Sequence, residues 1–227
     1  MIHPVLMLAR NNLELTKRAI DSVFSQDIGT TLMLVDNSTT DEVANWARDQ
    51  GRIAFWPMRP PLGVTAGWNF GLHRLFTDGW TRVLVVNNDL VLPTWFLREL
   101  LHRDVPFVSG VSVDVMPTEL PERIPLDPHP DFSAFLIHRT AWQTVGKFNP
   151  KMKLYASDNA WHVEAHRKGV RLWKANVPFY HERSSTLNLA SEEDRRAIQI
   201  QADADREVFR SLYGCLPWDP EYDELFK

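Results

Sequence analysis

Polar side chains gather at three points in the first ninety residues, each directly after a short apolar run. The three clusters are Arg10-Asn11-Asn12, Asp36-Asn37-Ser38 and Asn87-Asn88-Asp89. Asn and Asp also favour turns and helix caps, so any single cluster has a purely structural explanation. Three clusters at equivalent positions favour a ligand site. Asp89 follows a fully apolar strand, where a carboxylate is suited to bind a hard cation.

A helix expected near residue 157 carries further candidates. Asp158 is either a helix cap or a catalytic carboxylate. His162 and His166 stand four residues apart on one helical face, as two zinc ligands can. In a zinc protease the glutamate directly follows the first histidine, whereas Glu164 comes one position later. This misplacement argues against zinc hydrolysis.

The segment 63–71 contains Gly63, Gly67 and Gly71. Their spacing is not that of the dinucleotide-binding fingerprint, and the lysine of a P-loop is absent. Small residues at the start of a helix suit the close approach of a phosphate, and they equally suit close packing of a helix on a sheet. The sequence leaves both interpretations open.

These residues need a scaffold, and the first ninety residues alternate between strand-like and helical segments. Strands are expected at residues 5–9, 31–35, 53–56 and 82–86. A capping box at residues 38–41 opens the second helix, and Pro93 is expected in a first helical turn. This alternation predicts a mostly parallel sheet with helices on both faces, whose ligands collect outside the carboxyl ends of the strands.

The second half of the chain is less regular. Its expected elements are a strand at 107–113, a Pro-rich loop at 117–130, a strand at 132–137, helices at 139–146 and 157–169, strands at 170–174 and 177–181, and a helix at 191–213. No linker separates a second domain, so we expect one domain.

Composition excludes several protein classes. The chain has 227 residues, 44% hydrophobic and 24% charged, which is typical of a globular protein. The single cysteine, Cys215, rules out an internal disulfide framework. Without a signal peptide or a long apolar stretch, we expect a cytoplasmic protein with no membrane span. A net charge of −4 gives no global reason to bind nucleic acid.

The ordered motifs resemble glycosyltransferase family 2, whose members use nucleotide-diphosphate sugars, and its rhamnosyltransferase-type members in particular. The matching segments lie at residues 5–11, 35–39, 63–71, 85–89, 134–149, 155–158 and 178–181. The resemblance implies an α/β protein: a single GT-A domain over residues 1–227, with a Rossmann-like, mostly parallel sheet flanked by helices. Residues 188–227 would form a C-terminal helix and tail.

The resemblance implies roles for individual residues in binding the nucleotide-sugar donor. Asp36 would hydrogen-bond the nucleobase, usually uracil in this family. The other expected donor-binding residues are Ala9, Arg10, Asn11, Asn69, Asn87 and Asn88, with Arg183 and Ser185 as candidates for the diphosphate.

The resemblance also implies a metal site and a base. Asp89 stands at the last aspartate of the family's DxD motif, and His181 matches a histidine that often completes the site, so Mn²⁺ or Mg²⁺ is expected. Such a cation would offset the charge that develops on the leaving nucleoside diphosphate. Asp158 matches the aspartate of the ED motif, the general base of inverting members. The chain is therefore expected to be an inverting glycosyltransferase of the hexosyltransferase type that uses a UDP-sugar as its donor.

Two departures from the family pattern support an alternative. Asn87 replaces the first aspartate of DxD, and Ser157 replaces the glutamate of ED. Both losses fit a non-catalytic nucleotide-sugar-binding or interaction module of the same fold. Arg10 also stands where the family often has tyrosine.

Two acceptors stay open: a saccharide, or a 5-hydroxymethylpyrimidine base in DNA. Trp161 and His162 are the expected acceptor-binding residues. For DNA, Trp161, Trp142 and Trp173 would stack on a flipped base. A local basic cluster would bind phosphates, and it consists of His162, His166, Arg167, Lys168, Arg171 and Lys174. An ordinary solvated surface explains the same charges. The oligomeric state is open.

Overall fold

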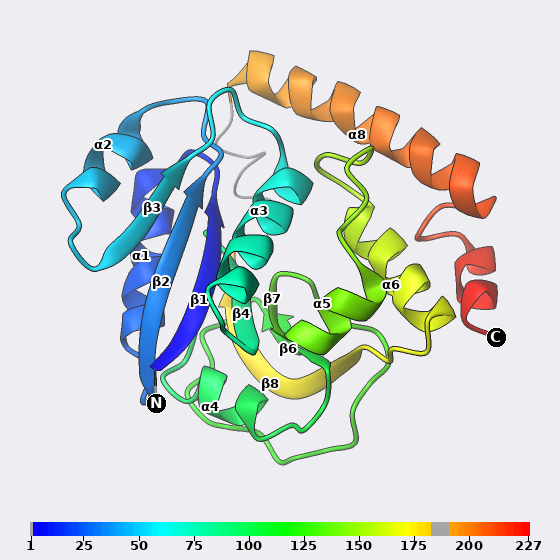
Figure 1. Ribbon diagram of the computed structural model, residues 1–227, viewed down its shortest axis with the longest axis horizontal. Coiled ribbons are helices and arrows are strands. Elements are labelled where there is room, and N and C mark those ends of the chain that lie inside the picture. Colours follow the sequence, from blue (N-terminus) through cyan, green and yellow to red (C-terminus); the bar gives the residue numbers. More distant parts are fainter. Residues whose placement is uncertain (1, 183–190) are drawn as a thin grey trace.

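The computed structural model describes residues 2–182 and 191–227. It is a mixed α/β domain built on an eight-stranded sheet with the order β3-β2-β1-β4-β7-β6-β8-β5 (Figure 1). The strands are β1 (Ile2–Ala9), β2 (Gly29–Asp36), β3 (Ile53–Pro57), β4 (Arg82–Asn87), β5 (Leu90–Val91), β6 (Phe107–Val113), β7 (Ala134–His138) and β8 (Trp173–His181). The helices are α1 (Leu13–Phe24), α2 (Glu42–Arg48), α3 (Val64–Thr77), α4 (Phe96–Leu101), α5 (Arg139–Val145), α6 (Ser157–Arg167), α8 (Glu192–Tyr213) and the 3₁₀ helix η1 (Pro220–Phe226).

Parallel pairing brings the polar strand ends together. Strand β1 lies between β2 and β4 and runs parallel to both. The register pairs Ala9 with Asp36 and Leu8 with Asn87, so these strands end at the same edge of the sheet. The predicted mostly parallel sheet is confirmed, with β7 and β5 as the antiparallel strands.

Strand β8 closes the site from the other side. It pairs parallel with β6 and antiparallel with β5, which places His181 opposite Leu90. The prediction of two short strands at 170–174 and 177–181 is wrong, because a single strand runs from Trp173 to His181 and residues 170–172 lie before it. Its pairing with β6 shifts register between Ser109 and Val111, and this irregularity falls where the sequence indicated a break.

Side chains that alternate along the central strands pack into two hydrophobic cores, one on each face of the sheet. Val5 and Met7 face the side that α1, α2 and α4 cover. Leu6 and Leu8 face the side that α3, α5 and α6 cover. A third, smaller cluster joins α6 to α8 and η1, and in Figure 1 this C-terminal segment, orange to red, lies beside α6.

Glycines let α3 approach the sheet closely. A Cβ at Gly67 would lie 2.3 Å from a methyl of Leu8, and one at Gly71 would lie 2.3 Å from a methyl of Leu6. These contacts favour the packing interpretation of the small residues in α3. At its start Gly63 has a φ of 95°, and a Cβ there would lie 2.5 Å from the Lys153 carbonyl oxygen.

Two local predictions are wrong in detail. Helix α2 begins at Glu42 without a side-chain cap, because the Ser38 hydroxyl instead accepts a hydrogen bond from the Asn11 backbone N–H at 2.7 Å. Helix α4 begins at Phe96, so Pro93 lies before the helix. Within the described ranges, no helix has the length and apolar character needed to cross a membrane.

Candidate active site

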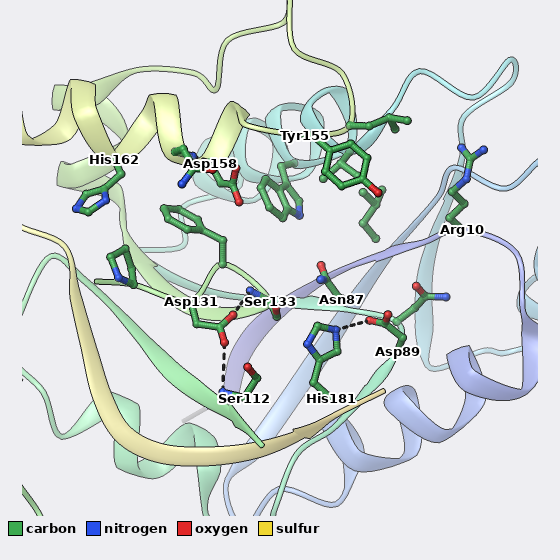
Figure 2. Close-up of a pocket in the computed structure, with 18 of the residues that line it drawn as sticks. Arg10, Asn87, Asp89, Ser112, Asp131, Ser133, Tyr155, Asp158, His162 and His181 are labelled. Carbon is green, nitrogen blue, oxygen red and sulfur yellow. Dashed lines mark hydrogen bonds and ion pairs between the residues drawn. The ribbon is translucent and has the colours of Figure 1, made fainter. Parts of the chain in front are cut away.

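A cavity of about 890 Å³ opens at the carboxyl ends of β1 and β4 (Figure 2). Residues that follow β1, β2 and β4 form one side, and the start of α6 faces them. The loop before β7, strand β8 and the C-terminal segment complete the walls. The lining side chains that can donate, accept or titrate include Arg10, Asn37, Trp68, Asn87, Asn88, Asp89, His129, Asp131, Tyr155, Asp158, His162, His181 and Tyr222.

Asp89 and His181 meet in this cavity. The Oδ1 atom of Asp89 lies 3.1 Å from Nε2 of His181, and both side chains are largely buried. An aspartate oxygen and an imidazole nitrogen are both donors that Mn²⁺ accepts. Among the described residues, no group of three or more His, Cys, Asp or Glu side chains is arranged to hold a metal ion. The pair therefore fits a cation that takes its other ligands from phosphate oxygens and water.

Asp158 lies in the first turn of α6 and lines the cavity. Burial raises the pKa of its carboxyl group, and the negative charge of Asp131 adds to that rise. The Asn159 backbone N–H donates to Asp158 at 2.9 Å, which partly offsets the effect. A carboxylate with a raised pKa is a stronger base than an exposed one.

Two buried hydroxyls hold the start of α6 in place. Thr65 of α3 donates to the Met152 carbonyl oxygen at 2.5 Å, and its hydroxyl oxygen lies 2.8 Å from the Ser157 hydroxyl, which can donate to it. Ser157 is 2% exposed and replaces the glutamate that the resemblance led us to expect. Its hydroxyl ties two helices together beside Asp158.

Asp205 supports the same region, and the sequence analysis missed it. Its fully buried carboxylate accepts backbone N–H groups from Lys153, Leu154 and Tyr155 at 3.0, 2.7 and 2.9 Å. Helix α8 thereby anchors the loop that leads to Asp158. The alternation of small and charged residues in α8 gave no sequence signal for this contact.

Three buried donors in the cavity wall have no hydrogen-bond partner among the described residues: Arg10 Nε, Asn37 Nδ2 and Trp68 Nε1. A buried donor without an acceptor costs about 1–3 kcal/mol. All three come from segments next to the carboxyl ends of β1 and β2 or from α3. A ligand rich in acceptor oxygens would satisfy them.

Asp36 does not line the cavity. It is fully buried and accepts from Arg59 Nη2 at 2.8 Å and from the Ser38 backbone N–H at 3.0 Å. Arg59 covers it, so the expected direct contact between Asp36 and a base needs Arg59 to move or to take part. The sequence analysis missed Arg59, although it follows β3 as the other polar residues follow their strands.

Several expected ligand contacts are corrected. Trp161 is 2% exposed, stacks on Phe148 and donates to the Gly146 carbonyl oxygen at 2.9 Å, so its ring is core. Asn69 is bonded to the Phe148 backbone at both its amide atoms. Ala9 is buried within the core next to α1 and α2.

The remaining asparagines have mixed placements. Asn11 donates to and accepts from Thr39, so it joins two loops and does not line the cavity. Asn88 lines the cavity, but its amide nitrogen donates to the Thr16 hydroxyl at 2.8 Å. Asn87 lines the cavity between Asp89 and Ser133 (Figure 2). Arg183 and Ser185 fall outside the described residues.

The residues expected to bind DNA are poorly placed for it. Trp142 and Trp161 are buried, so their rings cannot stack on a flipped base, and Trp173 is partly buried against the core. Lys174 is paired with Asp127 at 3.2 Å and Arg167 with Glu164 at 3.0 Å, which neutralises part of the basic cluster.

His162 does line the cavity. Burial lowers its pKa to about 4, with smaller contributions from His129 and His166, so its ring is neutral near pH 7. Phe226 of η1 covers one side of the ring at a centroid distance of 4.4 Å. The C-terminal segment thus forms part of the wall beside Asp158.

Solved structures of similar fold identify the fold of this chain. No family model and no curated protein sequence matches the chain. Mannosyltransferase PcManGT from Pyrobaculum calidifontis, solved in complex with GDP-Man and Mn²⁺, is similar over 99% of this chain and 67% of that chain, with a TM-score of 0.63 and 14% identity.

Two structures of S. aureus TarS are also similar. The 1–349 fragment has a TM-score of 0.61 and 13% identity, over 100% of this chain and 78% of that chain. A longer TarS structure has a TM-score of 0.62 and 14% identity, and this chain spans 47% of it. The chain therefore has a GT-A-like glycosyltransferase fold.

Proposed function

We propose that the protein is a glycosyltransferase that moves a sugar from a nucleotide-diphosphate sugar to an acceptor hydroxyl. One observation carries this proposal: a single cavity holds a carboxylate of raised pKa, Asp158, together with the Asp89–His181 pair and three unpartnered buried donors. Solved proteins of similar fold support it, since PcManGT was solved with GDP-Man and the TarS fragment with UDP-GlcNAc or UDP.

The donor is proposed to occupy the side of the cavity next to β1 and β2. Phosphate and sugar oxygens there would accept from Arg10, Asn37 and Trp68, whose buried N–H groups lack partners. The base would lie near the Asp36–Arg59 pair, where a guanidinium is held ready to donate to a nucleobase carbonyl. We propose UDP as the first nucleotide to test.

A divalent cation, Mn²⁺ or Mg²⁺, is proposed to be held by Asp89 and His181 together with the donor diphosphate. When bound, it would neutralise charge on the leaving nucleoside diphosphate. Asp89 lies in the turn between β4 and β5, and His181 is the last residue of β8, so the β5–β8 pairing must be in place for the pair to form.

The transfer is proposed to invert the anomeric centre. Asp158 takes the proton of the acceptor hydroxyl while that oxygen bonds to the anomeric carbon. The bond from this carbon to the phosphate oxygen breaks on the opposite face, and the nucleoside diphosphate leaves with the electron pair. Asp158 then releases its proton to solvent. Neutral His162 beside it adds no charge that would lower its basicity.

Two measurements test the function. Titration calorimetry with UDP, GDP, dTDP and their sugars in MnCl₂ should detect binding to the wild-type protein. Asp158→Asn should lower transfer or hydrolysis by about 10²–10⁴-fold and leave nucleotide affinity unchanged. Asp104→Asn, a fully exposed site, is the matched control. The proposal fails if no nucleotide-sugar binds.

The same experiment decides for or against the non-catalytic alternative. Ser157 is engaged in holding two helices, and Asn87 lacks a carboxylate at the cation site. If nucleotide-sugars bind but stay intact after long incubation with saccharides, the protein is a binding module. Loss of binding and turnover together in Asp158→Asn would indicate that Asp158 has a structural role.

A further inference from the structure

A second carboxylate, Asp131, faces the cavity from the loop before β7 (Figure 2). One of its oxygens accepts from the Ser112 backbone N–H at 3.2 Å and the other from the Ser133 backbone N–H at 2.9 Å. Its own backbone N–H donates to the Ser109 hydroxyl at 2.8 Å. The side chain is thus held by the backbone of β6 and of the residue before β7, and the Asp131 backbone is tied to β6.

The Asp131 carboxylate can accept further hydrogen bonds beyond those described. An ionised carboxylate has about four lone-pair sites, and the contacts described use one on each oxygen. Asp131 is partly exposed, and its exposed part belongs to the cavity lining. A hydroxyl of a molecule in the cavity can therefore donate to it.

Asp131 and Asp158 line one part of the cavity, and the negative charge of Asp131 is a smaller cause, after burial, of the raised pKa of Asp158. Titratable side chains that line the same part are Tyr155, Asp158 and His162 near α6, Tyr222 of η1, His129 and Asp131 of the loop before β7, and Lys174 of β8. Lys174 is already paired with Asp127, and the pKa of His162 is about 4. Both carboxylates therefore line one cavity, and Lys174, a cation in its lining, is already paired with another acid.

We propose that Asp131 is an acceptor-binding residue that accepts a hydrogen bond from one hydroxyl of the acceptor while Asp158 deprotonates another. This inference rests on the proposed function and adds an acceptor class to it: a neutral molecule with at least two hydroxyls. A phosphodiester chain would meet like charge from both carboxylates. A hydroxymethyl base in DNA offers a single alcohol and brings phosphates with it.

The test compares wild-type protein, Asp131→Asn and the exposed control Asp104→Asn. UDP release from UDP-glucose, UDP-GlcNAc and UDP-galactose in MnCl₂ is measured with water alone, with a pool of neutral methyl glycosides and disaccharides, and with duplex DNA containing 5-hydroxymethylcytosine. Asp131→Asn should lose about ten- to a hundredfold of the saccharide-dependent release, because a charge-assisted hydrogen bond is removed. Its UDP affinity should stay within about twofold of wild type.

A pH profile separates ligand binding from a structural role. Removing the charge of Asp131 should lower the pKa of Asp158, so the acid limb of the profile should move to lower pH in Asp131→Asn and stay in place in Asp104→Asn. The proposal is overturned if Asp131→Asn keeps full saccharide-dependent release, if the pool gives no stimulation, or if only the modified DNA stimulates.

One readout does not depend on turnover. A ¹³C NMR titration of side-chain carboxyls, with Asp158→Asn identifying the Asp158 signal, measures the coupling in ligand-free protein. An Asp158 titration that is unchanged in Asp131→Asn overturns the inference even if the enzyme is active. If wild-type protein consumes no nucleotide-sugar but the Asp158 titration shifts, the proposed function fails, and the electrostatic step of the inference stands.

Discussion

Asp89 Oδ1 lies 3.1 Å from His181 Nε2, although the two residues are 92 positions apart in the chain. The contact forms because β5, directly after Asp89, pairs with β8 so that Leu90 lies opposite His181. A cation held by this pair would replace a hydrogen bond that the protein already makes. The β5–β8 register therefore determines whether these two side chains can hold the proposed cation together.

Removing the imidazole should weaken cation-dependent nucleotide binding. We expect His181→Ala to lower UDP affinity in MnCl₂ by about tenfold or more, because loss of a ligand costs at least that much in comparable sites. In EDTA the variant and wild type should bind UDP alike. His73→Ala, an exposed histidine on α3, is the control for titration calorimetry. Equal losses with and without Mn²⁺ would contradict a role in metal binding.

Asp158→Asn should stabilise the folded protein near neutral pH. Since the folded protein holds the pKa of Asp158 above that of the unfolded chain, folding favours the protonated form, and stability falls as pH rises through the folded pKa. The neutral amide avoids this cost. Each kcal/mol gained should raise Tm by about 2–4 °C at pH 7.

Below the unfolded pKa of about 3.9, both states hold the proton and the advantage should vanish. Differential scanning calorimetry at pH 7 and in acid measures both limits. An Asp158→Asn variant that is less stable than wild type at pH 7 would show that the carboxylate serves mainly as a helix-start anchor.

His162 should make the protein sensitive to mild acid. Its pKa is about 4 in the folded protein and about 6.5 in the unfolded chain, so the unfolded state binds the proton first as pH falls. Stability from this group is complete above pH 6.5 and declines toward pH 4. Thermal melts across this window should be flatter for His162→Gln than for wild type. The exposed His73→Gln on α3 should keep the wild-type slope.

Asp205→Asn should loosen the loop before Asp158. An amide nitrogen cannot accept, so at least one backbone N–H of residues 153–155 would lose its partner, at a cost of about 1–3 kcal/mol. We expect Tm to fall by roughly 2–12 °C. Hydrogen exchange should accelerate at residues 153–155. Asp203→Asn, exposed on the same helix, should change neither quantity.

Local pattern was sufficient for the order of the elements and for much of the site. Apolar runs followed by polar clusters predicted β1, β2 and β4, and parallel pairing makes the ends of such strands meet at one edge. The resemblance of the ordered motifs then pointed to Asp89, His181 and Asp158, which the structure places around one cavity.

Side-chain direction and distant partners depended on tertiary structure. Trp161 was expected to face an acceptor, yet its ring fills the core, because helical spacing alone does not say which face a neighbouring helix covers. Arg59 covers Asp36 from a loop 23 residues away. Asp131 lies in a Pro-rich segment without periodicity.

The sequence by itself thus determined the scaffold and the polar ends of its strands, since both follow from local hydrophobic patterning. Only the tertiary structure decided which side chains face the cavity. Asp131 is held by the backbone of β6 and of Ser133, and Asp205 by the loop before α6, the latter through contacts between residues 50 or more positions apart. Such contacts leave no periodic trace in the sequence.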